Sequence, residues 1–322
     1  MRVLVTGGAG FIGSHIVERL IARGHVVTVL DNLSTGCIEN VHPAAAFVQA
    51  DITDPHLPRA LAGEPFDAVI HQAAQVSVPR SLDDPLFDAQ VNFVGTLRLL
   101  DYCCRSNVKR FVFASSAAVY GNSRALPVTE DAPTDPLSPY ALSKLAAEEY
   151  LRRFTCDSNF KIVILRYANV YGPRQSVRGE AGVVHAFMHQ RLVGGTLIVH
   201  GDGRQTRDFI CVDDVAEANL LALKPDAPPG VYNIGTGQPT SILELHHLLA
   251  GAGGPLHYAP PRPGDVRHSA LDITAARSAL GWRPTVSLVD GLARARRHFF
   301  DSSQPALAAA AFTAQGSPTL IH

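Results

Sequence analysis

The chain has 322 residues, and its 28 Lys and Arg against 29 Asp and Glu give a formal net charge of −1. This balance excludes a strongly basic protein that binds nucleic acid or an anionic membrane surface through its charge. Hydrophobic residues make up 46% of the chain and charged residues 18%, which excludes global disorder and allows a sizeable core.

Short apolar segments in the first half of the chain predict buried strands. They are residues 3–6, 26–30, 47–50, 68–70, 111–114 and 162–166, and the segments between them have helical character, above all 88–106 and 139–154. Buried strands that alternate with helices form parallel sheets covered on both faces. We therefore predict an α/β fold, a Rossmann-type doubly wound parallel sheet with a smaller C-terminal substrate-binding lobe.

A glycine-rich loop follows the first strand and leads into a helix with apolar periodicity. Gly7, Gly10 and Gly13 stand in this loop. Glycines at such positions allow a tight turn and let backbone N–H groups approach a pyrophosphate at the positive end of the helix. A lone glycine pattern is weak evidence, but the strand before it and the helix after it make this a predicted dinucleotide site.

Carboxylates at the ends of the next two strands support the same site. Asp31 ends the second strand, 18 residues after Gly13, where a carboxylate can accept the hydroxyls of an adenosine ribose. The segment 31–34 has no arginine for a 2′-phosphate, which favours NAD over NADP. Asp51, after the third strand, could contact adenine or could simply form a turn, and the sequence leaves both interpretations open.

A later motif begins a helix that carries reactive groups. Ser138 can cap this helix and Pro139 fits its first position, so Tyr140 and Lys144 lie one turn apart on one face. A phenol is a poor base at neutral pH, but a nearby ammonium favours its phenolate, and Tyr140 could then act as general base and acid. Ser116, after the fifth strand, would lie at the carboxyl edge of the sheet, where ligands bind. In isolation these residues would be an ordinary surface pair and a turn-forming serine.

The second half of the chain has glycine- and proline-rich connections and fewer regular strands. We predict an NAD-binding domain at 1–170, to which 205–235 returns, and a substrate-binding lobe made of 171–204 and 236–301. The alanine-rich segment 302–322 has no amphipathic pattern, so we expect a disordered tail.

The cysteines and the apolar runs indicate the cellular compartment in which we expect the protein. The five cysteines are an odd set without metal-ligand spacing, so we expect reduced thiols in a cytoplasmic protein and no metal site. The first residues show no signal peptide, and no apolar run approaches the roughly 18 residues of a membrane span. We therefore expect neither a membrane nor a nucleic acid as partner.

Several motifs together resemble the extended short-chain dehydrogenases/reductases of the NAD-dependent epimerase/dehydratase family, over about residues 1–300. Besides the segments above, the motifs are His71-Gln72-Ala73-Ala74, Ser115-Ser116-Ala117-Ala118-Val119-Tyr120-Gly121, Asn169-Val170-Tyr171-Gly172-Pro173-Arg174 and Tyr232-Asn233-Ile234-Gly235. Within the family, the chain is most similar to the 4-epimerases of UDP-hexoses. The resemblance implies tightly bound NAD and a UDP-sugar substrate.

The residues between Ser116 and Tyr120 distinguish reactions within the family. The dehydratases that the chain resembles carry an Asp–Glu pair there, whereas this chain has Ala117 and Ala118. Elimination of water then has no evident catalyst, while 4-epimerisation needs only one base and a hydride acceptor. The resemblance implies that Tyr140 removes the C4 hydroxyl proton, that NAD accepts the hydride, and that the 4-keto sugar rotates before the hydride returns.

The resemblance also assigns residues to the site. The expected catalytic residues are Ser116, Tyr140 and Lys144. The expected cofactor-binding residues are Gly7, Gly10, Phe11, Ile12, Gly13, Asp31, Asn32, Ser34, Thr35, Gly36, Asp51, Ile52, Gln72, Ala73, Ala74, Asn92, Ser115, Tyr140, Lys144 and Tyr167. The expected substrate-binding residues are Ser116, Tyr140, Asn169, Val184, Val199, His200, Arg207, Arg262, Asp265 and Ser269, with the two arginines on the diphosphate.

The resemblance leaves the sugar open. Ser269 stands where some relatives carry a bulky tyrosine that closes the pocket against an N-acetyl group, so we expect both UDP-glucose/UDP-galactose and UDP-GlcNAc/UDP-GalNAc as substrates. A UDP-glucuronate 4-epimerase is an alternative, in which Arg178 or a hydroxyl could bind the carboxylate. Some hexose epimerases also carry a basic residue in the segment that is 75–77 here, and none is present in it.

Other functions on the same fold are further alternatives. They are a nucleotide-sugar reductase or dehydratase of the family and a non-enzymatic NAD-sensing regulator, although such regulators tend to lose the tyrosine and lysine that this chain keeps. The helices at 88–106 and 140–154 resemble those that pair in family dimers, so a homodimer is expected.

Overall fold

A parallel sheet of seven strands forms the centre of the protein. The computed structural model describes the chain except residues 62, 64, 124, 155–159, 177–181, 194, 251–255, 262–264 and 316–322. The strand order is β10-β6-β5-β4-β1-β2-β3, and every neighbouring pair is parallel. The strands are β1 Arg2–Thr6, β2 Val26–Asp31, β3 Ala46–Gln49, β4 Ala68–His71, β5 Arg110–Ser116, β6 Lys161–Tyr167 and β10 Gly230–Ile234.

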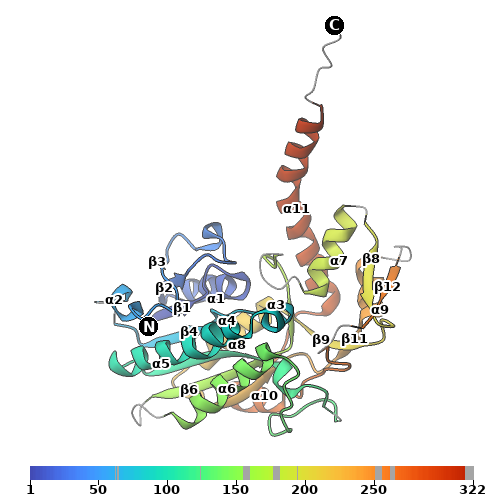
Figure 1. Cartoon of the computed structure of the whole chain (residues 1–322). Helices are drawn as coiled ribbons and strands as arrows, with labels where there is room; N and C mark the ends of the chain where they lie inside the picture. The colour runs from blue at the N-terminus through green and yellow to red at the C-terminus, as the bar shows by residue number, and fades with distance from the viewer. Residues whose placement is uncertain are drawn as a thin grey trace.

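Helices connect these strands and cover both faces of the sheet (Figure 1). The longer helices are α1 Phe11–Ala22, α5 Thr96–Arg105, α6 Pro139–Arg153, α7 Val183–Leu192, α8 Val212–Ala222, α9 Ile242–Ala250 and α11 Leu288–Gln315. The shorter ones are η1 Ile38–Asn40, α2 Leu57–Ala60, α3 Val78–Asp83, α4 Pro85–Ala89, η2 Gln90–Gly95, η3 Ala117–Tyr120 and α10 Thr274–Leu280.

The central strand β1 shows why its apolar run forms a buried strand. Val3 and Val5 pack on one face with α1, α8 and α10, while Leu4 packs on the other with α5 and α6. Successive side chains of a strand point to opposite faces, so a continuous apolar run can serve two helical layers. The predicted doubly wound α/β fold is therefore confirmed.

The helix predicted at 88–106 begins earlier and contains a wider turn. Its first part, α4, is capped by Asp84, whose side chain accepts a hydrogen bond from the backbone N–H of Phe87. The π-helical η2 follows and continues directly into α5. Such π segments occur often at functional sites. This one carries Asn92, which is buried beneath the candidate site.

The second lobe is built on two small sheets. Strands β7 (Asn169–Tyr171) and β11 (Pro239–Ser241) flank β9 (Thr206–Cys211), and β8 (Leu197–His200) pairs with β12 (Leu256–Ala259). Side chains from these sheets and from α7, α9 and α11 form a hydrophobic core of their own. Figure 1 shows this lobe beside one end of the large sheet.

Helix α11 corrects the prediction of a disordered tail. Its backbone is helical from Leu288 to Gln315 and so includes most of the segment 302–322, of which 316–322 lie outside the described residues. Alanine has the highest helix propensity, so an alanine-rich segment can be helical without an amphipathic face.

One cysteine also differs from the prediction. Among the described residues, Cys37, Cys103 and Cys211 are not disulfide-bonded, whereas Cys104 is, and Cys156 lies outside the described residues. A disulfide depends on which cysteines the fold brings within about 7 Å, and the spacing of cysteines along the chain does not reveal this distance.

In the part of the chain that the structure describes, no helix is long and apolar enough to cross a membrane.

A buried ion pair joins α6 to β6. Arg166 donates to both carboxylate oxygens of Glu148 at 2.6 to 3.1 Å, and the two side chains are 3% and 0% exposed. Glu148 also accepts a hydrogen bond from Ser115, and Arg166 donates one to the Tyr120 hydroxyl at 2.8 Å. The pair therefore connects α6 to the core of the sheet.

We expect Arg166→Ala to lower the free energy of unfolding by about 3 to 5 kcal/mol, because it leaves Glu148 charged and buried. Arg152→Ala is the matched control, since Arg152 pairs with Glu149 on the exposed side of the same helix and exposed pairs contribute at most about 1 kcal/mol. Urea unfolding followed by circular dichroism measures both variants. Equal losses in the two would contradict this account.

Candidate active site

A large cavity lies at the carboxyl ends of the parallel strands, where the second lobe meets them. Its volume is about 1490 Å³. Open parallel sheets bind ligands at this edge. The predicted site residues that line it are Gly7, Phe11, Ile12, Gly13, Asp31, Asn32, Ser34, Thr35, Asp51, Ile52, Gln72, Ala73, Ala74, Ser115, Ser116, Tyr140, Tyr167, Asn169, Val199, His200, Arg207, Asp265 and Ser269.

The glycine loop has the geometry that a bound pyrophosphate requires. Gly7 has φ +70°, and a Cβ added there would lie 2.6 Å from the backbone nitrogen of Ala73. A Cβ on Gly13 would lie 2.1 Å from the carbonyl oxygen of Gly7. The N-cap of α1, Gly10, makes no side-chain capping hydrogen bond, so no side chain satisfies the N–H groups at that end. These features fit a dinucleotide phosphate at the positive end of the helix.

Gly10 and Gly36 shape this loop without lining the cavity. A Cβ added to Gly10 would lie 3.1 Å from the carbonyl oxygen of Gly7. A Cβ added to Gly36 would lie 3.0 to 3.1 Å from atoms of Ala9. Both positions therefore allow close backbone packing behind the cavity wall.

The carboxylates predicted for the adenosine lie where β2 and β3 end. Asp31 accepts hydrogen bonds from the backbone N–H groups of Ala9 and Leu33, at 3.0 and 2.8 Å, and its burial raises the pKa of the carboxyl. Asp51 lines the cavity and also accepts hydrogen bonds from the backbone and hydroxyl of Thr53. Asp51 is therefore a turn former in the cavity wall, and its contact with adenine stays a prediction.

The catalytic helix begins as its sequence predicts. The Ser138 side chain accepts a hydrogen bond from the backbone N–H of Ala141 at 3.2 Å, and Pro139 occupies the first turn. Tyr140 then lines the cavity. Lys144, one turn later, is only 4% exposed, and its Nζ donates to the Ala114 carbonyl oxygen at 2.9 Å. The lysine therefore lies behind the cavity wall instead of in it.

Burial sets the protonation of the groups around this lysine. It lowers the pKa of Lys144 to about 8, against the opposing pull of the Asp88 and Glu148 carboxylates. His71 lies nearby on β4, and its burial, reinforced by the Lys144 charge, lowers its pKa to about 3. Its ring nitrogens contact the hydroxyls of Thr6 and Thr96 at 2.7 and 3.0 Å. The neutral imidazole is thus a structural link, and the charge beside the cavity is the ammonium.

The two serines at the end of β5 point in different directions. Ser115 donates to the buried Glu148, whereas the Oγ of Ser116 accepts a hydrogen bond from the backbone N–H of Ala118 at 3.2 Å. This leaves the Ser116 hydroxyl proton for donation toward a ligand oxygen. Ala117 and Ala118 line the same part of the cavity.

The second lobe supplies the opposite wall. Arg207 pairs with Asp265 and donates to the Thr206 carbonyl oxygen at 2.9 Å. Ser269 lies next to this pair, where its backbone N–H donates to the Thr206 carbonyl oxygen at 3.2 Å. Arg207, predicted to bind the diphosphate, is therefore a neighbour of the predicted substrate contacts Asp265 and Ser269, although it already has a carboxylate partner.

Two of the predicted residues do not line the cavity. Val184 is buried in the core of the second lobe, because α7 turns Val183, Ala186 and Phe187 toward the cavity instead. Asn92 is buried, and its side chain bonds to the backbone of Gln75 and does not line the cavity. Arg178 and Arg262 lie outside the described residues.

The segment 75–80, a short loop that continues into the first turn of α3, forms a cavity wall that the sequence did not predict. Its residues line the cavity, and Arg80 among them lies with its guanidinium 4.1 Å from the centre of the Phe87 ring. A basic residue, absent at 75–77, thus lines the cavity at position 80. Ser77 and Pro79 could have predicted the start of α3, because a capping serine and a proline in the first turn are typical of a helix N-terminus.

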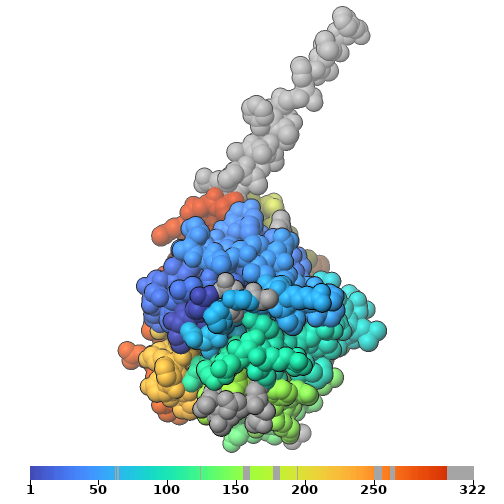
Figure 2. Space-filling model, turned by 90° about the vertical axis from the view of Figure 1, so that its left-hand side faces the viewer, coloured from blue at the N-terminus to red at the C-terminus, as the bar shows by residue number. Residues whose placement is uncertain are grey.

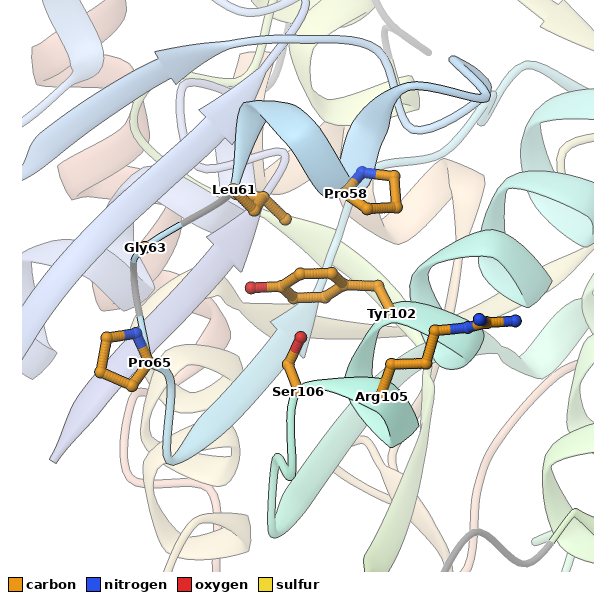
Figure 3. Close-up of a pocket in the computed structure, with 7 residues that line it drawn as sticks. All are labelled: Pro58, Leu61, Gly63, Pro65, Tyr102, Arg105 and Ser106. Atoms are coloured by element: carbon orange, nitrogen blue, oxygen red, sulfur yellow. The ribbon is translucent and has the colours of Figure 1, made fainter.

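A second cavity, of about 400 Å³, lies on the side of the protein shown in Figure 2, between the ends of α2 and α5. Figure 3 shows the Tyr102 ring between Leu61 and Ser106, while Arg105 points away from it. This cavity has none of the predicted site residues. The chemistry therefore belongs to the large cavity.

Comparison with known proteins agrees with this geometry. A family model described as "NAD dependent epimerase/dehydratase family" matches residues 3–235. The chain belongs to this family. A UDP-glucose 4-epimerase of Mycolicibacterium smegmatis is 47% identical over 313 residues, which cover 94% of this chain and 100% of the relative.

Solved structures of the family also superpose on the chain. A UDP-glucose 4-epimerase of Thermotoga maritima with UDP-glucose has a TM-score of 0.90 and 43% identity, and the match covers 94% of this chain and 100% of that one. A UDP-glucose 4-epimerase of Thermus thermophilus in complex with NAD has a TM-score of 0.87 and 45% identity, with 93% and 99% covered.

We expect Gly13→Ala to weaken NAD binding at least about tenfold, or about 1.4 kcal/mol, because the new methyl group would displace the loop from Gly7. Gly230→Ala is the control, since a Cβ there meets only the Tyr232 side chain, at 3.3 Å. Titration calorimetry with NAD, after removal of any co-purified cofactor, measures both affinities. Affinity equal to that of the unmodified protein in Gly13→Ala would refute this placement of the phosphates.

Proposed function

We propose that the chain is an NAD-dependent 4-epimerase of UDP-hexoses, which interconverts UDP-glucose and UDP-galactose. The observation that carries the proposal is one continuous cavity lined by the glycine loop, by Tyr140 and Ser116, and by Arg207. A cofactor at the loop and a sugar diphosphate at Arg207 would bring the sugar between them, beside Tyr140. The names of the similar proteins support the same substrate.

The glycine loop and Asp31 would hold NAD, with Gln72 and Tyr167 near the centre of the cavity. Gln72 donates to the Tyr167 hydroxyl at 3.0 Å, so these two side chains support each other. NAD, when bound, supplies a hydride acceptor for the sugar carbon. The side chains of the protein supply the rest of the chemistry.

Tyr140 would act as general base and acid on the C4 hydroxyl. Its phenolate takes the proton from that hydroxyl and returns it when the opposite configuration forms. The buried ammonium of Lys144 favours the phenolate through its charge. Ser116 donates a hydrogen bond to the same sugar oxygen and so orients it.

Ala117 and Ala118 favour epimerisation over dehydration. Both line the cavity beside Ser116, and neither can protonate or deprotonate a sugar. Tyr140 alone can serve the single proton transfer that 4-epimerisation needs.

A UDP-glucuronate 4-epimerase is the second candidate, because of Arg80. Its guanidinium lines the cavity, and no carboxylate among the described residues forms an ion pair with it. An unpaired cation of this kind suits the C6 carboxylate of a uronic acid.

We expect Tyr140→Phe to lower kcat for UDP-glucose epimerisation by about 10² to 10⁴, the usual contribution of a general base, while NAD and UDP-glucose still bind. Tyr150→Phe is the control, since Tyr150 lies on the outer side of the same helix and is 43% exposed. Proton NMR of the sugar product gives the rates. Full activity of Tyr140→Phe would overturn the mechanism.

We also propose that the pocket accepts N-acetylated sugars, because Ser269 lines the cavity with a small side chain. Ser269→Tyr should lower kcat/KM for UDP-GlcNAc at least about tenfold relative to that for UDP-glucose, since the ring fills the space of the acetyl group. Competition between the two sugars in one NMR tube measures this ratio. An unchanged ratio would place the acetyl group elsewhere.

We further propose a homodimer formed through α5 and α6. Leu86, Leu142 and Tyr150 are 82%, 57% and 43% exposed near these helices, and the Tyr150 ring stacks on Phe154 at 5.8 Å. Burial of these side chains against a second copy would remove apolar surface from water. Light scattering should give about twice the chain mass of 34.5 kDa. A monomer mass at micromolar concentration would refute the dimer.

A further inference from the structure

Asp88 is a buried carboxylate behind the catalytic helix. It lies on α4 and is 1% exposed. It accepts hydrogen bonds from the Ser143 hydroxyl at 2.6 Å, from Gln75 Nε2 at 2.7 Å and from Asn92 Nδ2 at 3.0 Å. Ser143 stands directly before Lys144, so the carboxylate is bonded to the helical turn that carries the reactive groups.

The same carboxylate is bonded to the cavity segment 75–80. Gln75 donates from Nε2 both to Asp88 and to the Ser77 carbonyl oxygen, and its Oε1 accepts from the Ser77 backbone N–H. Asn92 exchanges two hydrogen bonds of 2.9 Å with the backbone of Gln75. Asp88 therefore ties one wall of the cavity to the helix that forms another.

The Asp88 carboxylate also lies near Lys144, because Ser143, which donates to it, directly precedes this lysine on α6. Besides Tyr140, one turn away on α6, the groups around the Lys144 ammonium are the carboxylates of Asp88 and Glu148, the neutral ring of His71, the Phe113 ring, whose centre lies 5.0 Å from Nζ, and the carbonyl oxygen of Ala114. Glu148 shares its charge with Arg166, at 2.6 Å. The hydrogen-bond donors to Asp88 are all uncharged. Of the two carboxylates near Lys144, Glu148 therefore has an arginine partner, whereas Asp88 has none among the described residues.

We propose that Asp88 is a positioning residue: its carboxylate fixes the catalytic turn of α6 against the segment 75–80 and keeps Lys144 in its charged form. The part of the proposal that concerns turnover rests on the proposed epimerase function. The part that concerns the charge of Lys144 does not.

The charge of Lys144 can be measured without turnover. The chain has only four lysines, at 109, 144, 161 and 224, so NMR of protein labelled with ¹³C-lysine can titrate each one, and Lys144→Arg assigns the signal of interest. In Asp88→Asn, which keeps the size and removes the charge, the pKa of Lys144 should fall by about one unit. The alkaline limb of the kcat profile for UDP-glucose should move to lower pH by the same amount.

Two further variants separate positioning from charge. Asp83→Asn removes a charge from an exposed residue of the neighbouring helix, and it should change neither the titration nor kcat. Ser143→Ala keeps the Asp88 charge and removes its bond to α6, so the pKa of Lys144 should stay while kcat falls severalfold. The melting temperature should fall as well, because Asp88 loses one buried hydrogen bond, so kcat is measured well below that temperature, where the variant is folded.

Each variant tests one part of the proposal. An unchanged pKa of Lys144 in Asp88→Asn would overturn the charge role of Asp88, and an unchanged kcat in Ser143→Ala would overturn its positioning role. Should Asp88→Asn fail to fold, Ser143→Ala still decides the second. An inactive but folded unmodified protein would instead count against the proposed function, because the lysine titration requires no reaction.

Discussion

The site depends on the burial of one positive charge. Lys144 is only 4% exposed at the carboxyl edge of the sheet, and an ion moved there from water loses several kcal/mol of solvation unless other groups replace it. The Ala114 carbonyl oxygen and the carboxylates of Asp88 and Glu148 replace the lost solvation of Lys144. The buried charge of Glu148 is in turn balanced by Arg166, whose Nη1 donates a hydrogen bond to the Tyr120 hydroxyl. The polar interior of the domain follows from this requirement.

The second lobe is held to the sheet edge by another buried carboxylate. Asp208 is 0% exposed and accepts hydrogen bonds from the backbone N–H groups of Thr236, Gly237 and Leu271. Because Asp208 follows Arg207 on β9, fixing one residue fixes where the other enters the cavity. At each end of the proposed substrate site, a buried carboxylate that accepts hydrogen bonds from the protein fixes a neighbouring cation. Asp88 does so near Lys144, and Asp208 does so beside Arg207.

Local features of the sequence were sufficient for the strands, the glycine loop and the catalytic helix. An apolar run, a glycine that must adopt positive φ, and a Ser-Pro start of a helix act over a few residues, so Gly7, Ser138 and Tyr140 could be predicted. The positions that differed depend on contacts between distant segments. Val184 faces the core because of the rotation of α7, and the bond formed by Cys104 depends on which segments meet in space.

Epimerisation of a UDP-sugar at C4, with NAD that stays bound, can be observed by proton NMR of the purified protein with no added NAD, in separate samples of UDP-glucose, UDP-GlcNAc and UDP-glucuronate. We expect the C4 epimer of UDP-glucose to appear, and the other samples rank the alternatives. If no epimer forms in any sample, even after NAD is added, the protein is not a 4-epimerase of these sugars.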